Sequence, residues 1–533
     1  MKRILAFLCC AAMVLGLAAC NTNQEPSGSE PAASESVELK TSESTDFISF
    51  TPCGHSGGFS NYSPNVYETL LLYEDGELKP NLATEWEMNG NEITLKLRED
   101  VKFSDGEAFN AEAVKVNLES LYEYQYDSVA WFQVIGLLDH VEAVDEYTVK
   151  IVLTQPYYAA LYDLASSFAL GMMSPACFEV EGNPYENVFT TAGTGPYTIT
   201  DYEQGSSYVF ERNDNYWGEA PAVDKLTVNI VPDLDSRLLA LRSGEADFLL
   251  GVSNLSYDSF DELSETDGFT AVKSENHSKC DYILFNSANT ALQDAQVREA
   301  LSEAIDKESM VSNVLYGLQE NAAYMFDPAL PNCALDLPAY ESNKEHAGEL
   351  LDAAGWKLND ATGLREKDGQ ALTLKLVYQA GYGSNDSVAQ FLKSELEKVG
   401  VELTLESFDL TTYSTKIYEG SYDMALAFSY GVPYDPHVTL SGFVGYDLGD
   451  VSMQSFDFKE ELNGYLTELM QTTDSEKVAE LTEQALTLMH ENYAAIPLTY
   501  EKELVVFNNE KISGIEFFGQ PGLTVLQNIV PAK

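Results

Sequence analysis

Two side chains near the N-terminus have the types and the spacing of a metal-binding pair. Cys53 and His55 lie two residues apart in the glycine-rich segment Thr51–Gly58. A thiolate and an imidazole suit nickel, copper and zinc, and a flexible backbone lets both reach one ion. Because a complete site needs further ligands, the pair predicts metal binding as one of several interpretations of this segment.

The same segment also matches the GxSxG pattern of serine hydrolases. Gly54–Gly58 would place Ser56 at a nucleophile elbow, and His437 or His490 would complete a triad. An elbow needs a buried strand before it and a helix after it, whereas residues 59–64 are polar and rich in turn formers. We therefore expect a protein that is not an enzyme, with a secreted hydrolase as the distant alternative.

The elements that must position these residues are predicted by hydrophobic periodicity. Apolar residues recur at helical spacing over 297–315, with Gly317 as the C-cap, and over 388–399, closed by Gly400. Strand-like segments are short and are expected at 92–97, 148–153, 225–231, 372–378, 401–405 and 424–428. Mixed α/β lobes built around sheets are the natural arrangement of such elements.

The first residues have the pattern of a bacterial export signal with a lipid attachment site. A positive start, Lys2 and Arg3, precedes an apolar run from Ile4 to Ala19 that is shorter than the roughly 20 residues of a membrane-spanning helix. The end of that run resembles a lipobox, which implies cleavage before Cys20 and lipid on its sulfur. An ordinary signal with a chance cysteine is the alternative. Residues 20–43, rich in Ser, Glu, Pro, Thr and Ala, predict a disordered tether.

The remaining chain is strongly acidic. Removal of residues 1–19 takes away two basic residues and no acidic one, so 28 basic and 85 acidic side chains remain, a formal charge of −57. This charge makes nucleic acid an unsuitable partner. It favours solubility, with the gathering of cations as the alternative role.

Four cysteines remain after the signal and Cys20 are set aside. They are scattered without CxxC spacing and allow three disulfide pairings, none of which the sequence excludes: Cys53, Cys177, Cys280 and Cys333. At this low density we expect a fold that does not depend on disulfides.

Six longer motifs form a recognisable pattern along the chain. They are Leu82–Trp86, Leu95–Glu107, Gly193–Tyr197, Arg212–Gly218, Gly244–Asp247 and Val297–Lys307. Together they resemble the family 5 extracellular solute-binding proteins, which serve peptide and nickel ABC importers, from about Phe47 to the C-terminus. The resemblance implies an α/β, two-lobed periplasmic-binding-protein fold with two hinge crossings, near 275–285 and 496–503, and an extra subdomain in the N-terminal lobe.

The resemblance also implies a division of the chain. We expect a signal peptide at 1–19, a lipidated cysteine and tether at 20–43, lobe I at 44–280 with an inserted subdomain at about 75–190, lobe II at 281–498, and a return to lobe I at 499–533. A small solute would bind between the lobes and reach the ABC permease after closure. A monomer outside the cytoplasm, held to the membrane only by its lipid, is expected.

Within the family, Ser429–His437 resembles the nickel-binding proteins more than the peptide binders. The resemblance implies a cleft lined by His55, Trp131, Tyr430, Tyr434, Asp435 and His437, although simple packing is the alternative role of each aromatic residue. The arginines that hold a chelate's carboxylates in those proteins are missing at Ser128 and at 166–170. The histidine that reaches the metal there has no counterpart at 444–448.

These observations predict a transported ligand and no resident cofactor. Nickel or another transition metal, as a chelate, is the expected ligand, with Cys53 and His55 as candidate metal ligands. An oligopeptide is the alternative, because Asp435 is an acid suited to a peptide amine. The nickel proteins carry the same acid, so Asp435 does not distinguish the two.

Overall fold

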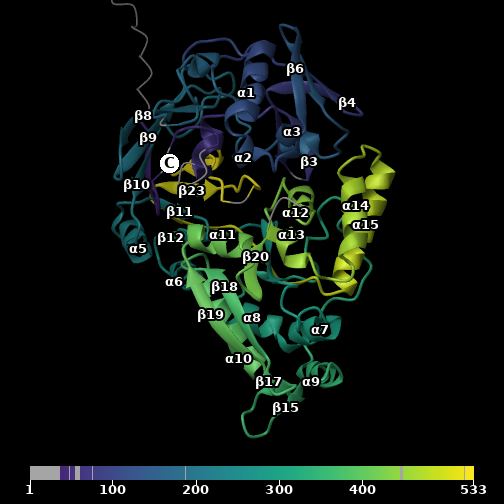
Figure 1. Ribbon diagram of the computed structural model, residues 1–533. Coiled ribbons are helices and arrows are strands. Elements are labelled where there is room, and N and C mark those ends of the chain that lie inside the picture. The colour runs from purple at the N-terminus through teal and green to yellow at the C-terminus, as the bar shows by residue number, and fades with distance from the viewer. Residues whose placement is uncertain are drawn as a thin grey trace, which may run out of the picture. The chain divides into compact units, whose positions relative to one another are not determined.

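A six-stranded mixed sheet lies at the centre of the later half of the chain. In this computed structural model, which describes residues 36–46, 49–53, 60–74, 76–186, 188–444, 448–520 and 522–533, Val37–Lys533 forms one compact unit (Figure 1). The sheet has the order β14-β21-β13-β20-β18-β19. Its strands are β13 (Lys279–Phe285), β14 (Glu320–Asn321), β18 (Thr373–Gln379), β19 (Glu402–Phe408), β20 (Met424–Phe428) and β21 (Ala495–Glu501).

The sheet confirms the predicted helix and strands of this region. The helix α10 (Asn385–Glu397) connects the parallel strands β18 and β19, and Gly400 follows it with a φ of +82° that suits glycine. Antiparallel pairing of β13 with both β20 and β21 brings residues 279–285 beside residues 495–501. The loop that carries Tyr430, Tyr434 and Asp435 follows β20 directly and leads into α12 (His437–Ser441).

Two four-stranded sheets belong to the earlier half of the chain. One has the order β1-β10-β9-β8 and consists of β1 (Glu38–Glu43), β8 (Tyr197–Glu203), β9 (Ser207–Arg212) and β10 (Lys225–Ile230). The other has the order β4-β5-β7-β6, with β4 (Ala83–Asn89), β5 (Glu92–Leu97), β6 (Leu138–Asp145) and β7 (Thr148–Leu153). Helix α1 (Ala111–Tyr124) packs on β6 and β7. The predicted strands at 92–97, 148–153 and 225–231 are confirmed.

The chain end pairs with strands from its middle. The strand β22 (Leu504–Asn508) lies between β11 (Phe248–Leu250) and β12 (Phe269–Lys273), and both of these run antiparallel to it. The small sheet of β23 (Ile512–Ile515) and β24 (Ile529–Pro531) follows. The lobe boundaries expected from the sequence remain predictions.

The expected tether is wrong at its C-terminal end, because Glu38–Glu43 forms the strand β1. This strand runs parallel to β10, and Thr41, Ser42 and Glu43 are buried. The Thr41 hydroxyl donates to the Phe248 carbonyl at 2.7 Å. Composition failed here because backbone pairing and side-chain hydrogen bonds make a strand of polar residues stable.

The single helix expected over residues 297–315 is also wrong. The segment forms two helices, α7 (Ala295–Ala304) and α8 (Lys307–Asn313), separated by an extended Ile305. Asp306 caps the second helix, since its carboxylate accepts the Ser309 N–H at 3.0 Å. Hydrophobic periodicity continues across the break because both helices bury one face, but the local Asp cap starts a new helix.

The other strands and helices of the described residues complete the fold. The remaining strands are β2 (Leu71–Glu74), β3 (Glu77–Pro80), β15 (Lys357–Leu358), β16 (Arg365–Lys367) and β17 (Gln370–Ala371). The remaining helices are α2 (Tyr126–Val129), α3 (Gln133–Gly136), α4 (Ala160–Asp163), α5 (Leu234–Ser243), α6 (Tyr257–Ser264), α9 (Lys344–Ala353), α11 (Leu410–Tyr418), α12 (His437–Ser441), α13 (Leu448–Met453), α14 (Lys459–Leu469) and α15 (Ser475–Glu491). Short 3-10 turns lie at Ser60–Asn65, Pro175–Phe178 and Leu526–Asn528.

Two further observations concern the described residues alone. No helix there combines the length and the apolarity that a bilayer crossing requires. No two of the four cysteines in that part of the chain form a disulfide.

Candidate ligand-binding site

The loop after β20 is held in place by its own acidic residue. Asp435 is 5% exposed, and its two carboxylate oxygens accept the Gly431 N–H at 2.8 Å and the Thr439 hydroxyl at 2.6 Å. Burial raises the pKa of Asp435 to about 6, although these hydrogen bonds oppose the shift. The predicted cleft residue Asp435 is thus turned into the loop, where it fixes the backbone that carries Tyr430 and Tyr434.

A buried contact ties this loop to the earlier half of the chain. His437 begins α12, and its Nε2 lies 3.1 Å from Oδ1 of Asp163 at the end of α4. Both side chains are buried, and the second oxygen of Asp163 accepts the Val134 N–H at 3.0 Å. The His437 ring packs against Tyr162 with 5.8 Å between ring centroids. His437 therefore positions the loop.

The three aromatic residues predicted for the cleft come together. Trp131 stacks on Tyr430 at 5.3 Å between centroids with 24° between the ring planes, and Tyr434 lies 6.3 Å from Trp131. Phe132 and Phe168 complete this aromatic cluster, with Phe132 stacked on Trp131 at 4.0 Å. All but Phe132 are partly exposed. Their contact with a ligand stays a prediction.

Serine residues occupy positions at which, by the resemblance, nickel-binding proteins have arginines. The Ser166 hydroxyl and the Tyr434 hydroxyl are hydrogen-bonded at 3.0 Å, and burial raises the pKa of Tyr434 to about 12. The carbonyl of Ser128 accepts the indole N–H of Trp131 at 2.8 Å. These positions hold the aromatic rings in place and contribute no positive charge.

The candidate metal ligands are only partly described. Cys53 is 4% exposed, and burial raises the pKa of its thiol, so the form that binds metals is disfavoured. His55 and Ser56 lie outside the described residues, as do positions 445–447. Within the described ranges no three His, Cys, Asp or Glu side chains are grouped to hold a metal ion. The pairing of Cys53 with His55 remains a prediction.

A cavity of about 280 Å³ borders the loop and is lined in part by residues that sequence reasoning missed. Its wall combines aromatic, acidic and hydroxyl groups, and no Lys or Arg is among its lining residues: Met88, Tyr158, Tyr162, Pro331, Asn332, Asp435, Pro436, His437, Thr473, Ser475, Val478 and Thr482. These residues come from segments far apart in sequence. Only Asp435, Pro436 and His437, which belong to the segment Ser429–His437, carried a sequence signal.

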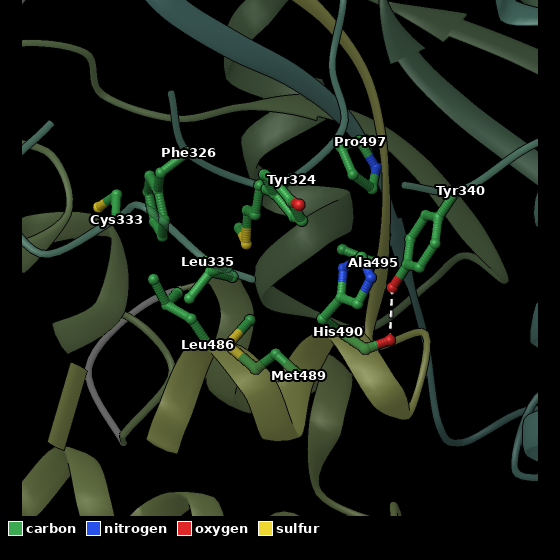
Figure 2. Close-up of a pocket in the computed structure, with 11 residues that line it drawn as sticks. Tyr324, Phe326, Cys333, Leu335, Tyr340, Leu486, Met489, His490, Ala495 and Pro497 are labelled. Carbon is green, nitrogen blue, oxygen red and sulfur yellow. Dashed lines mark hydrogen bonds between the residues drawn. The ribbon is translucent and has the colours of Figure 1, made fainter. Parts of the chain in front are cut away.

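The other candidate triad histidine, His490, lines a different pocket from His437. Figure 2 shows His490 among the mainly apolar side chains of this pocket, with the dashed line marking the Tyr340 hydroxyl donating to its carbonyl at 2.6 Å. The ring of His490 stacks on Tyr340 at 4.3 Å, and its Nε2 lies 2.9 Å from the Pro338 carbonyl. His490 is thus engaged in packing, as His437 is with Asp163.

The fold and the loop can now be compared with known proteins. The profile of bacterial extracellular solute-binding proteins, family 5 Middle, matches residues 77–448. The nickel-binding periplasmic protein of Escherichia coli (strain K12) is 30% identical over 461 residues, which cover 84% of this chain and 87% of that protein. The dipeptide-binding protein of the same strain is 26% identical over 467 residues, covering 82% and 83%.

A solved structure agrees with these matches. NikA from Brucella suis, in complex with Fe(III)-EDTA, has a TM-score of 0.88 at 30% identity and covers 93% of this chain and 99% of its own. Such a fold, with an aromatic cluster beside a loop at a strand end, defines a protein that binds solutes. The chain belongs to the bacterial extracellular solute-binding proteins of family 5. The predicted family and its α/β periplasmic-binding-protein fold are confirmed.

Proposed function

We propose that the protein is the substrate-binding component of an ABC importer, anchored outside the cell membrane by lipid on Cys20. It hands its solute to the permease and catalyses no reaction, with no resident cofactor. Family membership supports this role. The contact of His490 Nε2 with the Pro338 carbonyl, and the stacking of its ring on Tyr340, speak against His490 as the base of a triad with Ser56.

The ligand we propose is a transition-metal chelate, with nickel foremost. The observation that carries this proposal is the aromatic cluster of Trp131, Tyr430 and Tyr434, whose ring faces suit the flat faces of an organic chelator. The similarity to a nickel-binding protein over most of both chains supports it. The described residues offer no set of metal ligands, which favours an ion that arrives with its own chelator.

The groups around the aromatic cluster also indicate which charge the chelate carries. Ser128 and Ser166 place backbone and hydroxyl groups beside Trp131 and Tyr434, and the neighbouring cavity is lined by acidic, aromatic and hydroxyl groups. An anionic chelate would need basic partners to replace its hydration. We therefore propose a neutral or cationic chelate.

An oligopeptide is the competing ligand, and the similarity to a dipeptide-binding protein favours it. Asp435, the acid expected to bind a peptide amine, is already hydrogen-bonded within its own loop. Asp435 is buried, and its oxygens accept hydrogen bonds from Gly431 and Thr439. A peptide would need another acidic partner.

Calorimetric titration of residues 37–533 tests these alternatives. Free nickel, nickel with L-histidine, nickel with EDTA and a mixture of short peptides serve as four separate titrants. Tight binding of nickel with L-histidine, and weak binding of the anionic EDTA chelate, is the expected result. Binding of the peptide mixture without any response to nickel would replace the metal proposal by peptide import.

A further inference from the structure

Four charged or polar side chains gather on one face of the six-stranded sheet, away from the aromatic cluster. In the register of β13 and β21, Lys279 is opposite Glu501 and Asp281 is opposite Thr499. Residues two apart on a strand point to the same face, so all four share it. Lys279 Nζ lies 3.3 Å from Glu501 Oε1, and the Thr499 hydroxyl lies 3.4 Å from Asp281 Oδ2.

A small pocket of about 30 Å³ lies at this corner of the sheet. Its polar lining comes from the sheet and from the segments packed on it: Tyr257, Asp281, Gln319, Tyr382, Ser384, Asn385, Thr499 and Glu501. Apolar side chains, among them Met310, Leu315, Val388 and Phe428, form the rest of the lining. None of the aromatic-cluster residues lines the pocket, so it is separate from the candidate ligand site.

The charges around the pocket do not balance. Lys279 is the ammonium that faces three carboxyl groups, those of Asp281, Glu501 and Glu503, among the described residues. Burial, and then repulsion from Glu501, raises the pKa of Asp281 to about 7, and the same causes raise the pKa of Glu503 to about 7. The arrangement lacks positive charge.

The buried amide oxygen of Gln319 indicates independently that the pocket lacks a positively charged or hydrogen-bonding group. Gln319 is 4% exposed and lines the pocket, and its Nε2 is hydrogen-bonded to the Tyr257 hydroxyl. Its Oε1 is buried and has no hydrogen-bond partner. A buried carbonyl oxygen left without a donor or a cation costs free energy, so a group that satisfies it is expected.

We propose that this pocket is a binding site for a small monovalent cation, held by Asp281, Glu501 and the amide oxygen of Gln319. The ligands are all oxygen atoms, which suit hard cations and not the soft transition metals proposed for the ligand site. Lys279 beside Glu501 already supplies one positive charge and repels a divalent ion more strongly than a monovalent one. The site goes beyond the proposed solute-binding function and does not depend on it.

Thermal unfolding of residues 37–533 in chloride salts of equal ionic strength at pH 8 tests the site. Potassium, sodium and ammonium are compared with choline, which is too large for the pocket. At least one small cation should raise Tm by about 3 °C or more, with saturation as its concentration rises. The same Tm in all four salts would overturn the proposal.

Variants separate the site from general salt effects. Gln319→Met and Asp281→Asn should each abolish the difference between small cations and choline. Glu43→Gln should keep it, because Glu43 is also a buried carboxyl with a pKa raised to about 7 but belongs to β1. If Asp281→Asn fails to fold, Gln319→Met still decides, since a cation response that survives it excludes the site.

A direct readout comes from crystals soaked in rubidium chloride, because rubidium replaces potassium and scatters anomalously. An anomalous peak within bonding distance of Asp281 and Gln319 Oε1 is expected. A pocket with no peak, in crystals that show rubidium elsewhere or nowhere, would contradict the proposal for a potassium-sized ion.

Discussion

His437 and Asp163, which are 274 residues apart in sequence, meet through a 3.1 Å contact between Nε2 and Oδ1. Both side chains are buried, and Asp163 also accepts the Val134 N–H. One carboxylate therefore orders the start of α12, the end of α4 and the start of α3. Loss of the Asp163 carboxylate should therefore destabilise both the folded unit and the loop after β20.

The first prediction follows from this contact. Asp163→Asn retains the shape but leaves one acceptor for two donors, so the free energy of unfolding should fall by about 1–3 kcal/mol. Urea unfolding followed by circular dichroism measures it. The matched control is His140→Ala, which removes an exposed ion pair with Asp139 at 2.6 Å and should change little. An unchanged midpoint for Asp163→Asn would show that the contact is dispensable.

The second prediction concerns the aromatic cluster. Trp131→Ala removes the ring that stacks on Tyr430 and should weaken binding of nickel with L-histidine about tenfold or more, a loss of about 1.4 kcal/mol. Isothermal titration calorimetry gives the affinity. Trp356→Ala is the control, because that tryptophan lies near Lys367, outside the cluster. Equal affinity in wild type and Trp131→Ala would remove the cluster from the site.

The third prediction concerns thiol reactivity. Cys53, Cys280 and Cys333 are buried, and burial raises the pKa of each thiol, so none should react with iodoacetamide in the native protein at pH 8. Cys177 is partly exposed, and its pKa is raised to about 11, so it should react slowly. Intact mass spectrometry counts the adducts.

In urea all four cysteines should be modified, which controls for reagent quality. Rapid native modification of Cys53 would mean that its thiol is accessible and would strengthen its candidacy as a metal ligand. The result therefore tests the Cys53 and His55 hypothesis without any metal present.

The fourth prediction is a decline of stability with rising pH. Burial raises the pKa of Asp281, Glu43, Glu68 and Glu503 to about 7 from ordinary values near 4. Between these limits the folded chain binds more protons than the unfolded chain, so the free energy of unfolding falls as pH rises from about 4.5 to 7.5. Urea unfolding at several pH values in choline chloride measures this slope.

A variant checks the origin of the slope. Glu503→Gln should make it shallower, because the glutamine has no proton to lose. Stability that rises steadily from pH 4.5 to 7.5 would show that carboxylates with lowered pKa values dominate instead.

Regular elements were predictable where local signals were strong. The helix that ends before Gly400 and the strands at 92–97 and 372–378 follow from periodicity and from a glycine suited to positive φ. The break at Asp306 was missed because both helices bury the same face, so the apolar pattern continues across it. A helix cap depends on a single side chain, and an apolar pattern averaged over many residues does not reveal it.

The candidate site was predictable only where a family resemblance pointed to it. Trp131, Tyr430 and Tyr434 do lie together. The partner of His437 was missed because an aspartate 274 residues away has no local signature. The inward turn of Asp435 was also missed, because the two donors to its carboxylate, the Gly431 N–H and the Thr439 hydroxyl, are brought to it only by the folded loop.

The strand β1 has a consequence for secretion and handling of the protein. It covers the edge of β10 with six paired residues and brings Glu43 against Asn254, whose amide donates to it at 3.0 Å. Proteolysis or truncation after Glu43 would uncover that edge and remove one of the two acceptors of the Asn254 amide, leaving the Leu250 carbonyl. An open strand edge recruits strands of other molecules, so the shortened protein should aggregate, and a soluble form has to begin at or before Val37.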